Sequence, residues 1–346
     1  MTASAAVTNT LYVPGSTYGS DFGGTAFREA THLPGHPVVL ARGDIRCYAG
    51  LIPMLLDRFG KLGYVPEIAV IAIAGNWRDG RWDFTNLPAW ETVTEQEVLA
   101  ATGVRIMRFI NDMQAAKVGA TIVPRDRLVL LKDGAPQPGR SIAALTASTG
   151  NNFNSGEPDA SLSMHREAGH VRVPVPIDFS DVMYLVADAS RDHHATVEDL
   201  IAGQRGPAMI AHYVATSSQP PRNVLKQLDN TPPKEVGKLM TYGVMDHVPF
   251  WTRVGRLYAD VLGYVLNSVI VGDLVGELIV QGSVIMGTPG FAQWMFNPKN
   301  TSLLDNLIST GLPKSYVAED CTVWGAPDDA NMATLGAERI ARSFLS

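Results

Sequence analysis

The sequence predicts an α/β fold that is divided into two domains. Short apolar runs that end at glycine, such as EIAVIAIAG (67–75) and SIAALTASTG (141–150), are typical of buried strands. Apolar residues at helical spacing lie between these runs, as over 45–62, and the alternation indicates strands connected by helices. A chain of 346 residues is longer than one ordinary hydrophobic core accommodates, which favours two domains.

The composition is that of a globular protein and argues against two kinds of partner. Hydrophobic residues make up 46% and charged residues 18% of the chain, which indicates a folded protein. The net charge is −6 and no long basic run occurs, so neither a nucleic acid nor an anionic membrane is expected as a partner. The polar N-terminus lacks the charged and apolar regions of a signal peptide, which predicts a cytoplasmic location.

The most apolar stretch, 258–280, contains Asp260, Asp273 and Glu277. Three carboxylates are not expected in a membrane span, so we interpret this stretch as a buried helix followed by a strand. Cys47 and Cys321 are too few for a disulfide framework or a zinc site, and we interpret them as thiols of a reducing compartment. The pair His193-His194 has no partner at metal-ligand spacing, and no metal role is predicted for it.

Local signals define further elements. Thr94 and Glu97 have the spacing of a capping box, which predicts that a helix begins at Thr94. Pro53 predicts a kink or the first position of the helix within 45–62. The strand VRIMRFIND (104–112) ends in two polar residues, and a helix is predicted from the residue that follows. The polar, proline-rich stretch 217–235 is interpreted as a connection, an exposed excursion from the second domain.

Candidate chemistry lies where predicted strands end, because loops leave an α/β sheet at those points. Asp21, Asp112 and Gly150 all occupy such positions. Taken alone, an aspartate that follows an asparagine, as Asp112 follows Asn111, is as well explained by a turn or by a helix N-cap. A catalytic role for Asp112 therefore depends on the residues around it.

Several segments resemble motifs of the bacterial glucokinase family, in that family's order. DFGGT (21–25), followed by Arg28, resembles its first phosphate motif. The remaining matching segments are AIAG (72–75), FTNLPAWE (84–91), FINDM (109–113), REAGH (166–170), TVEDLIAG (196–203), ELIVQGSV (277–284) and TLGAERIA (334–341). Each motif alone is weak evidence, but their ordered occurrence over about 10–345 predicts membership of the family.

The resemblance implies the two-domain actin-like ATPase fold, which is ribonuclease H-like. The smaller domain would comprise 1–112 and 331–346, and the larger domain 113–330. The implied activity is that of a sugar kinase of carbohydrate metabolism and glycolysis. It would transfer a phosphoryl group from ATP, with Mg²⁺, to a primary hydroxyl of glucose or a glucose-like sugar. A homodimer is the assembly that the family leads us to expect.

The resemblance also assigns roles to individual residues. Asp112 would be the catalytic base that accepts the proton of the attacking hydroxyl. The residues implied in sugar binding are Asn86, Asn111, Asp112, Glu167, His170 and Glu198. The residues implied in nucleotide binding are Asp21, Gly23, Gly24, Thr25, Thr149, Gly150 and Gly282. Asp21 would lie near Mg²⁺ through water, since this ion dehydrates reluctantly. A solvated surface position explains Glu198 equally well, and an ordinary turn explains Gly23-Gly24.

The nucleotide side departs from the family pattern. TASTGNN (146–152) replaces GPGTGLG, and IVQG (279–282) replaces IAGG. Three interpretations follow: ATP bound by a modified loop, another phosphoryl donor, or a non-catalytic sugar-binding regulator with a decayed ATP site. A scaffold without either activity is a further alternative. The acceptor side is retained, but it does not separate glucose from a C7 cyclitol of aminocyclitol biosynthesis.

Overall fold

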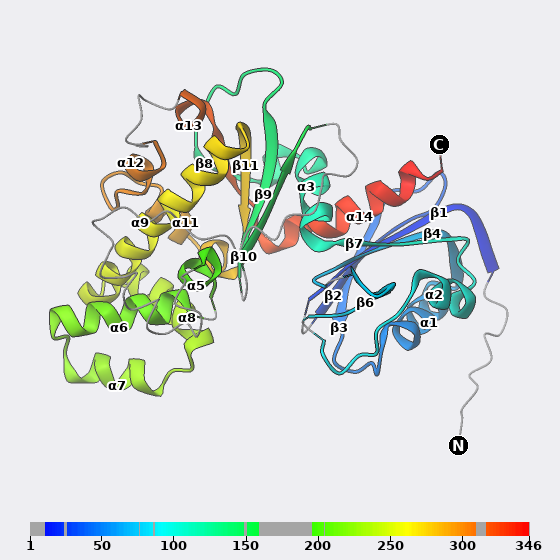
Figure 1. The fold of residues 1–346 in the computed structure, drawn as a ribbon, viewed down its shortest axis with the longest axis horizontal. Helices are drawn as coiled ribbons and strands as arrows, with labels where there is room; N and C mark the ends of the chain where they lie inside the picture. Colours follow the sequence, from blue (N-terminus) through cyan, green and yellow to red (C-terminus); the bar gives the residue numbers. More distant parts are fainter. Residues whose placement is uncertain are drawn as a thin grey trace. The chain divides into compact units, whose positions relative to one another are not determined.

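The computed structural model describes residues 11–23, 26–75, 77–85, 87–148, 151–158, 196–203, 205–308 and 316–345. These residues form two compact units (Figure 1). Unit 1 holds the described residues up to Val123 together with those from Asn331 onward. Unit 2 holds the described residues between Pro124 and Ala330. Each unit contains its own five-stranded sheet and its own apolar core.

The sheet of unit 1 has the strand order β3-β2-β1-β4-β7. Its strands are β1 (Leu11–Phe22), β2 (Ala26–His32), β3 (Val39–Asp44), β4 (Tyr64–Ile73) and β7 (Ile106–Asn111). The first three strands pair antiparallel, whereas β1, β4 and β7 run parallel. All ten residues of β4 are buried, as a strand covered on both faces requires. A small hairpin, β5 (Trp77–Arg78) and β6 (Arg81–Trp82), follows β4 in the chain.

Helices cover both faces of this sheet. They are α1 (Leu51–Leu62), α2 (Glu95–Thr102), α3 (Asp112–Ile122) and α14 (Met332–Ser343). Successive residues of β1 face opposite helices, as strand geometry requires. The Tyr18 ring packs edge-on against Phe59 of α1, with 5.3 Å between ring centroids. Gly19 faces the backbone of Glu338 in α14.

The close crossing of α3 and α14 decides which unit α3 belongs to. A Cβ atom on Gly119 would collide with the carbonyl oxygen of Met332, and one on Gly336 would collide with that of Ala115. The division of the chain therefore falls after Val123, whereas the sequence predicted a boundary after Asp112. The reason is packing: α3 completes the layer that α14 forms on this sheet.

Unit 2 shares the pattern of four strands with unit 1, but its fifth strand pairs at the other edge of the sheet. Its strands are β8 (Val129–Lys132), β9 (Ser141–Ala147), β10 (Asn151–Gly156), β11 (Val275–Gln281) and β12 (Thr322–Gly325), in the order β10-β9-β11-β12-β8. The strands β9, β11 and β12 are parallel, and β10 pairs antiparallel with β9. The connections β1–β2 and β9–β10 therefore occupy equivalent places in the two sheets.

Helices of unit 2 surround α9 (Pro249–Gly272). The others are α5 (Val197–Ile201), α6 (Gly206–Ser218), α7 (Arg222–Asn230), α8 (Pro233–Met245), α10 (Ser283–Met286), α11 (Phe291–Met295), α12 (Leu303–Ile308) and α13 (Tyr316–Asp320). Two short 3₁₀ turns also belong to this unit: η1 (Arg125–Arg127) precedes β8, and η4 (Asp328–Ala330) follows β12. Among the described residues, α9 is the one helix long and apolar enough to cross a membrane. Most of its apolar window, 61%, is buried inside the protein, as in a core helix. Since β11 follows α9, the predicted succession of helix and strand is confirmed.

Two local predictions need correction, and one is confirmed. The stretch 217–235 is more than a connection, because it contains α7 and the first residues of α8. Its prolines lie at the starts of helices, where a backbone N–H has no acceptor within the helix. Proline, which lacks this N–H, therefore loses no hydrogen bond there. The helix predicted within 45–62 begins only at Leu51, so that Pro53 lies inside its first turn. Thr94 and Glu97 form the predicted capping box of α2.

The two thiols differ in environment, which predicts different reactivity. Cys321 is fully buried beside β12, and burial raises the pKa of its thiol to about 12. Cys47 is exposed. At pH 8 we expect a disulfide reagent to modify one thiol rapidly in the native protein and a second only after denaturation, because the thiolate is the reactive form. Cys47→Ser should abolish the rapid phase, and rapid modification of both thiols in the native protein would contradict this assignment.

Candidate active site

The carboxyl ends of three parallel strands meet at one edge of the unit 1 sheet. Phe22 of β1 pairs with Ile73 of β4, and Ile73 pairs with Asn111 of β7. The three strands therefore end in the same row. Since neighbouring strands lie about 4.8 Å apart, the ends of β1 and β7 are separated by about 10 Å. Such an edge is where loops of an α/β sheet gather their polar side chains.

The side chain of Asn111 caps the N-terminus of α3. Its Oδ1 accepts a hydrogen bond of 2.8 Å from the Met113 N–H. The Gln114 side chain returns a bond by accepting from the Asn111 N–H at 3.2 Å. The two bonds form a capping box. The N-cap interpretation that the sequence left open therefore applies to Asn111, and Asp112 is the first residue of the helix.

Asp112 holds its carboxylate at this same edge. The side chain is half-buried, and its Oδ1 accepts a hydrogen bond of 2.8 Å from the N–H of Met113. The first turn of a helix favours negative charge, because unpaired N–H groups point toward it. The backbone thus fixes one carboxylate oxygen and the direction of the group. A carboxylate held in this way can accept a proton from a hydroxyl placed beside it.

Asp21 lies on the same face of the sheet as α3 and α14. The Thr17 hydroxyl donates to Oε1 of Glu338 in α14 at 2.9 Å, and Gly19 faces the same helix. Strand alternation therefore directs Asp21 to this face. Its Oδ2 lies 3.4 Å from Nη1 of Arg28, the residue opposite it on β2. Asp21 and Asp112 are thus brought to one edge and one face of unit 1.

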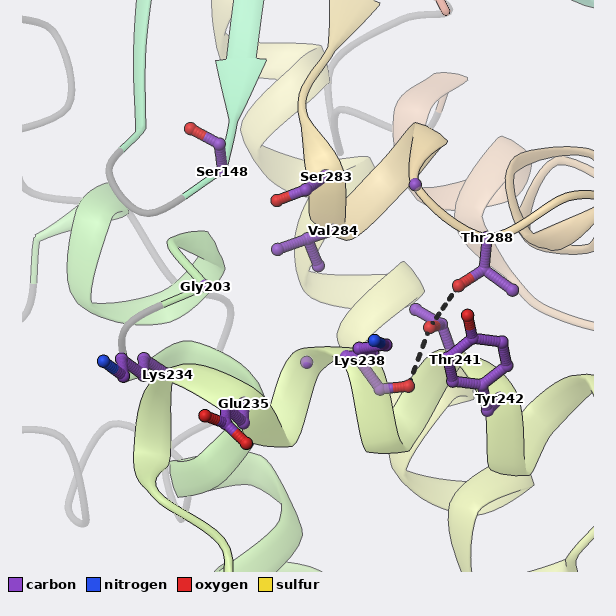
Figure 2. A pocket seen from close by; sticks show the side chains of 12 residues that line it. Ser148, Gly203, Lys234, Glu235, Lys238, Thr241, Tyr242, Ser283, Val284 and Thr288 are labelled. Atoms are coloured by element: carbon purple, nitrogen blue, oxygen red, sulfur yellow. Dashed lines mark hydrogen bonds between the residues drawn. The ribbon is translucent and has the colours of Figure 1, made fainter. Parts of the chain in front are cut away.

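Unit 2 contains a pocket of about 340 Å³ (Figure 2). It is lined by Ser148, Gly203, Lys234, Glu235, Gly237, Lys238, Thr241, Tyr242, Ser283, Val284, Gly287 and Thr288. These residues come from the end of β9, the end of α5, one side of α8 and the segment around α10. The volume is that of a small-molecule site.

Backbone contacts bring three segments of this pocket together. The Gly203 N–H donates a hydrogen bond of 2.5 Å to the carbonyl oxygen of Ser148. Gly282, between β11 and α10, has a φ of +111°, and a Cβ there would collide with the carbonyl oxygen of Ala147. Glycine is therefore required at this turn. These contacts join the end of β9, the end of α5 and the start of α10.

One helix contributes the polar wall of the pocket. Lys234, Lys238, Thr241 and Tyr242 follow one another at the spacing of a single helix face on α8. The Lys238 ammonium lies 5.7 Å from the centroid of the Tyr242 ring. Sequence reasoning missed these residues because it interpreted 217–235, which includes Lys234, as a connection and predicted no element for the residues directly after it. The spacing i, i+4, i+7, i+8 was the signal that could have revealed them.

A model of the glucokinase family matches residues 21–290 of this chain. The chain belongs to the glucokinase family. It is accordingly a sugar kinase, as the sequence motifs predicted. No curated protein matches it.

Solved structures place this family member in the actin-like ATPase fold, which confirms the predicted fold class. Glucokinase from an Antarctic psychrotroph superposes with a TM-score of 0.76 at 17% identity, over 95% of this chain and 99% of its own. Glucokinase from Balamuthia mandrillaris in complex with glucose has a TM-score of 0.72 at 18% identity, over 94% and 93%. A ROK family glucokinase from Streptomyces griseus, in complex with glucose and AMPPNP, has a TM-score of 0.61 at 18% identity, over 95% and 99%.

The structure accounts for part of the predicted site of this glucokinase-family member. It brings Asn111, Asp112 and Asp21 to one sheet edge, as described above. Gly23 closes the β1–β2 turn by donating from its N–H to the carbonyl of Ala26 at 3.0 Å. Gly282 adjoins the pocket of unit 2.

The other predicted residues divide into two groups. Glu198 lies in the first turn of α5, in unit 2, and is not among the described residues that line the pocket. Predicted residues outside the described part of the chain are Gly24, Thr25, Asn86, Thr149, Gly150, Glu167 and His170. Over the described ranges, no cluster of three or more His, Cys, Asp or Glu side chains is arranged to hold a metal ion.

Proposed function

We propose that this enzyme transfers the γ-phosphoryl group of ATP to a primary hydroxyl of glucose or a glucose-like sugar. The observation that supports this most is that Asn111, and not Asp112, caps the start of α3. Asn111 caps the helix, so the Asp112 carboxylate is not needed for that purpose. It stands instead at the carboxyl edge of the sheet with its direction fixed by the Met113 N–H.

In the proposed reaction, Asp112 accepts the proton of the sugar hydroxyl while its oxygen attacks the γ-phosphorus. The bond between that phosphorus and the bridging oxygen of ADP breaks, and ADP leaves with the electron pair. The products are a sugar phosphate and ADP. A positioned carboxylate supplies such a proton acceptor in phosphoryl transfer, and the rest of catalysis is positioning and electrostatic stabilisation.

We assign the nucleotide base to unit 2 and Mg²⁺ to unit 1, in each case on the residues of that unit by itself. The base and ribose of ATP would occupy the pocket lined by α8, whose Lys234 and Lys238 carry positive charge. Asp21 fits a place near Mg²⁺, because it offers carboxylate oxygens at the end of β1 and its contact with Arg28 is long. The ion would neutralise charge on the phosphates, which themselves supply most of its ligands. Glu167, His170, Glu198 and Asn86 remain proposed sugar ligands, by resemblance, and a cytoplasmic location accords with this activity.

The test is a phosphoryl-transfer assay with ATP and Mg²⁺ over a panel of hexoses and C7 cyclitols. We expect ³¹P NMR to show a phosphate monoester at the primary hydroxyl of a glucose-like acceptor and ADP in equal amount. The matched control is 6-deoxyglucose, which keeps the ring but lacks the acceptor oxygen and should yield no ester. Sugar binding without transfer to any acceptor would contradict the proposal and favour a non-catalytic sugar-binding protein.

A further inference from the structure

The loop of residues 84–90, between β6 and α2, is tied to the carboxyl edge of the unit 1 sheet. At its start, the Thr85 N–H donates to the carbonyl oxygen of Ala74, which directly follows β4, at 3.0 Å. Further along, the Leu87 N–H donates to the carbonyl oxygen of Phe84, and the Trp90 N–H to that of Leu87, each at 2.9 Å. Two backbone hydrogen bonds in succession thus hold the loop together.

The side chain of Trp90 fixes the far end of this loop. The residue is 9% exposed, and its indole Nε1–H donates to the carbonyl oxygen of Tyr48 at 3.2 Å. The ring packs edge-on against Phe84 of the same loop, with 5.4 Å between ring centroids, and against Phe22 at the end of β1, with 6.4 Å. Aromatic pairs in this arrangement stabilise beyond the area that they bury. One side chain therefore joins the loop to the last residue of the first strand.

The carbonyl group that accepts the indole bond is itself held in place. Tyr48 precedes α1, and its hydroxyl donates to Oδ2 of Asp57 on α1 at 2.5 Å. The same oxygen accepts a bond of 2.7 Å from the Lys61 ammonium, and these two contacts lower the pKa of the Asp57 carboxyl. The Tyr48 ring also packs edge-on against Phe27 of β2. The bond from Trp90 therefore ends on a backbone group that α1 and β2 position.

Trp90 thus connects two parts of unit 1 to which chemistry has been assigned. Phe22 directly follows Asp21 in β1. The chain residue between Thr85 and Leu87 is Asn86, a proposed sugar ligand that lies outside the described residues. A loop that keeps Thr85 and Leu87 in place also limits where a residue between them can bind, because consecutive Cα atoms are about 3.8 Å apart.

We propose that Trp90 is a positioning residue of the acceptor site, whose indole N–H holds the 84–90 loop in its sugar-binding conformation before the sugar arrives. This inference rests on the proposed function, since it takes Asn86 as a sugar ligand. A ligand binds more tightly to a loop that it does not have to order. Loss of the N–H should therefore raise the KM and the Kd of the sugar together. The kcat should stay unchanged, because bound sugar restores the same loop.

The first test compares the wild type with Trp90→Phe, which keeps an aromatic ring but lacks the N–H donor. With glucose as the probe, we expect KM and Kd to rise about fivefold, the effect of one hydrogen bond, and kcat to change by less than about twofold. Trp90→Leu also loses the two ring contacts, so its KM and Kd should rise about thirtyfold. Steady-state kinetics and isothermal titration measure these quantities. An unchanged KM in a folded Trp90→Phe would overturn the inference.

The second test measures amide hydrogen exchange of the full chain without sugar. In Trp90→Phe, the peptide that contains the 84–90 loop should exchange about fivefold faster, whereas peptides of β4 should exchange as in the wild type. A Trp90 that only adds stability to the core would change both sets of peptides together. Equal protection of the loop in the two proteins would contradict the positioning role.

The matched control is Phe59→Leu. Phe59 of α1 is 2% exposed, belongs to the same apolar core as Trp90 and packs edge-on against Tyr18. This variant should lower the Tm of unit 1 but keep the wild-type KM for glucose. Thermal unfolding verifies that each variant folds. If Phe59→Leu raised KM as much as Trp90→Phe does, the effect of Trp90 would be one of stability and the inference would fail.

The two proposals fail in different ways, because hydrogen exchange requires neither turnover nor bound sugar. If the loop loses protection in Trp90→Phe but the wild type phosphorylates no acceptor, the proposed function fails and the contact between Trp90 and the loop stands. If the wild type phosphorylates glucose, and Trp90→Phe matches it in KM and in exchange, the role of Trp90 alone fails.

Discussion

Asp112→Asn is expected to lower kcat by about 10³-fold and to change the Kd of the sugar by less than about threefold. Asparagine has the size of aspartate, and its Oδ1 can keep the bond from the Met113 N–H. The helix start is preserved because Asn111 and Gln114 form its capping box. What the variant loses is the ability to accept the proton. Steady-state kinetics with a titration of sugar binding measure the two effects separately.

The control for this variant is Asp126→Asn, which makes the same change at an exposed position of η1. It should retain the kcat of the wild type. An unchanged kcat in Asp112→Asn would eliminate Asp112 as general base. A large loss of sugar affinity without a loss of kcat would show that Asp112 only binds the acceptor.

Gly336→Ala is expected to lower the free energy of unfolding of unit 1 by about 3 kcal/mol or more. The new methyl group would meet the carbonyl oxygen of Ala115 on α3, and backbone cannot move aside as a flexible side chain can. Gly119→Ala should act in the same way against Met332. For a unit of this size, the loss corresponds to a fall in Tm of about 10 °C, measured by calorimetry.

Gly60→Ala is the matched control within the same unit. Gly60 lies in α1, and a Cβ there would have no atom within 4 Å. Alanine at this position should raise stability by about 0.5–1 kcal/mol, since glycine is a poor helix former. If Gly336→Ala were as stable as the wild type, the close crossing of α3 and α14 would be disproved.

Elements defined by local signals are the ones that the sequence predicts well. The apolar runs that become β4 and β9, and the capping box of α2, depend on neighbours in the chain. The region of α7 and the start of α8 was wrongly predicted because the proline-rich stretch 217–235 was interpreted as a connection. The position of its prolines at helix starts becomes evident only when the apolar faces of these helices meet α6 and α9.

The residues of the candidate site could likewise be predicted only where a local sequence signal marks them. Asp112 and Asp21 were predicted because each stands at the end of a strand within a motif. The hydrogen-bonded Thr241–Thr288 pair of the unit 2 pocket was not, because 47 residues separate its members and Thr288 has no local signal. A hydrogen bond of this kind exists only once tertiary packing has buried both hydroxyls.

The packing of α14 against β1 sets an order of events during protein synthesis. The first strand of unit 1 leaves the ribosome early, but the helix that covers it is encoded after Ala330. Unit 2 has its own sheet and core and can fold on the nascent chain before that helix exists. Until translation reaches Ser343, the part of the unit 1 sheet that α14 covers remains exposed, a surface suited to transient protection by chaperones.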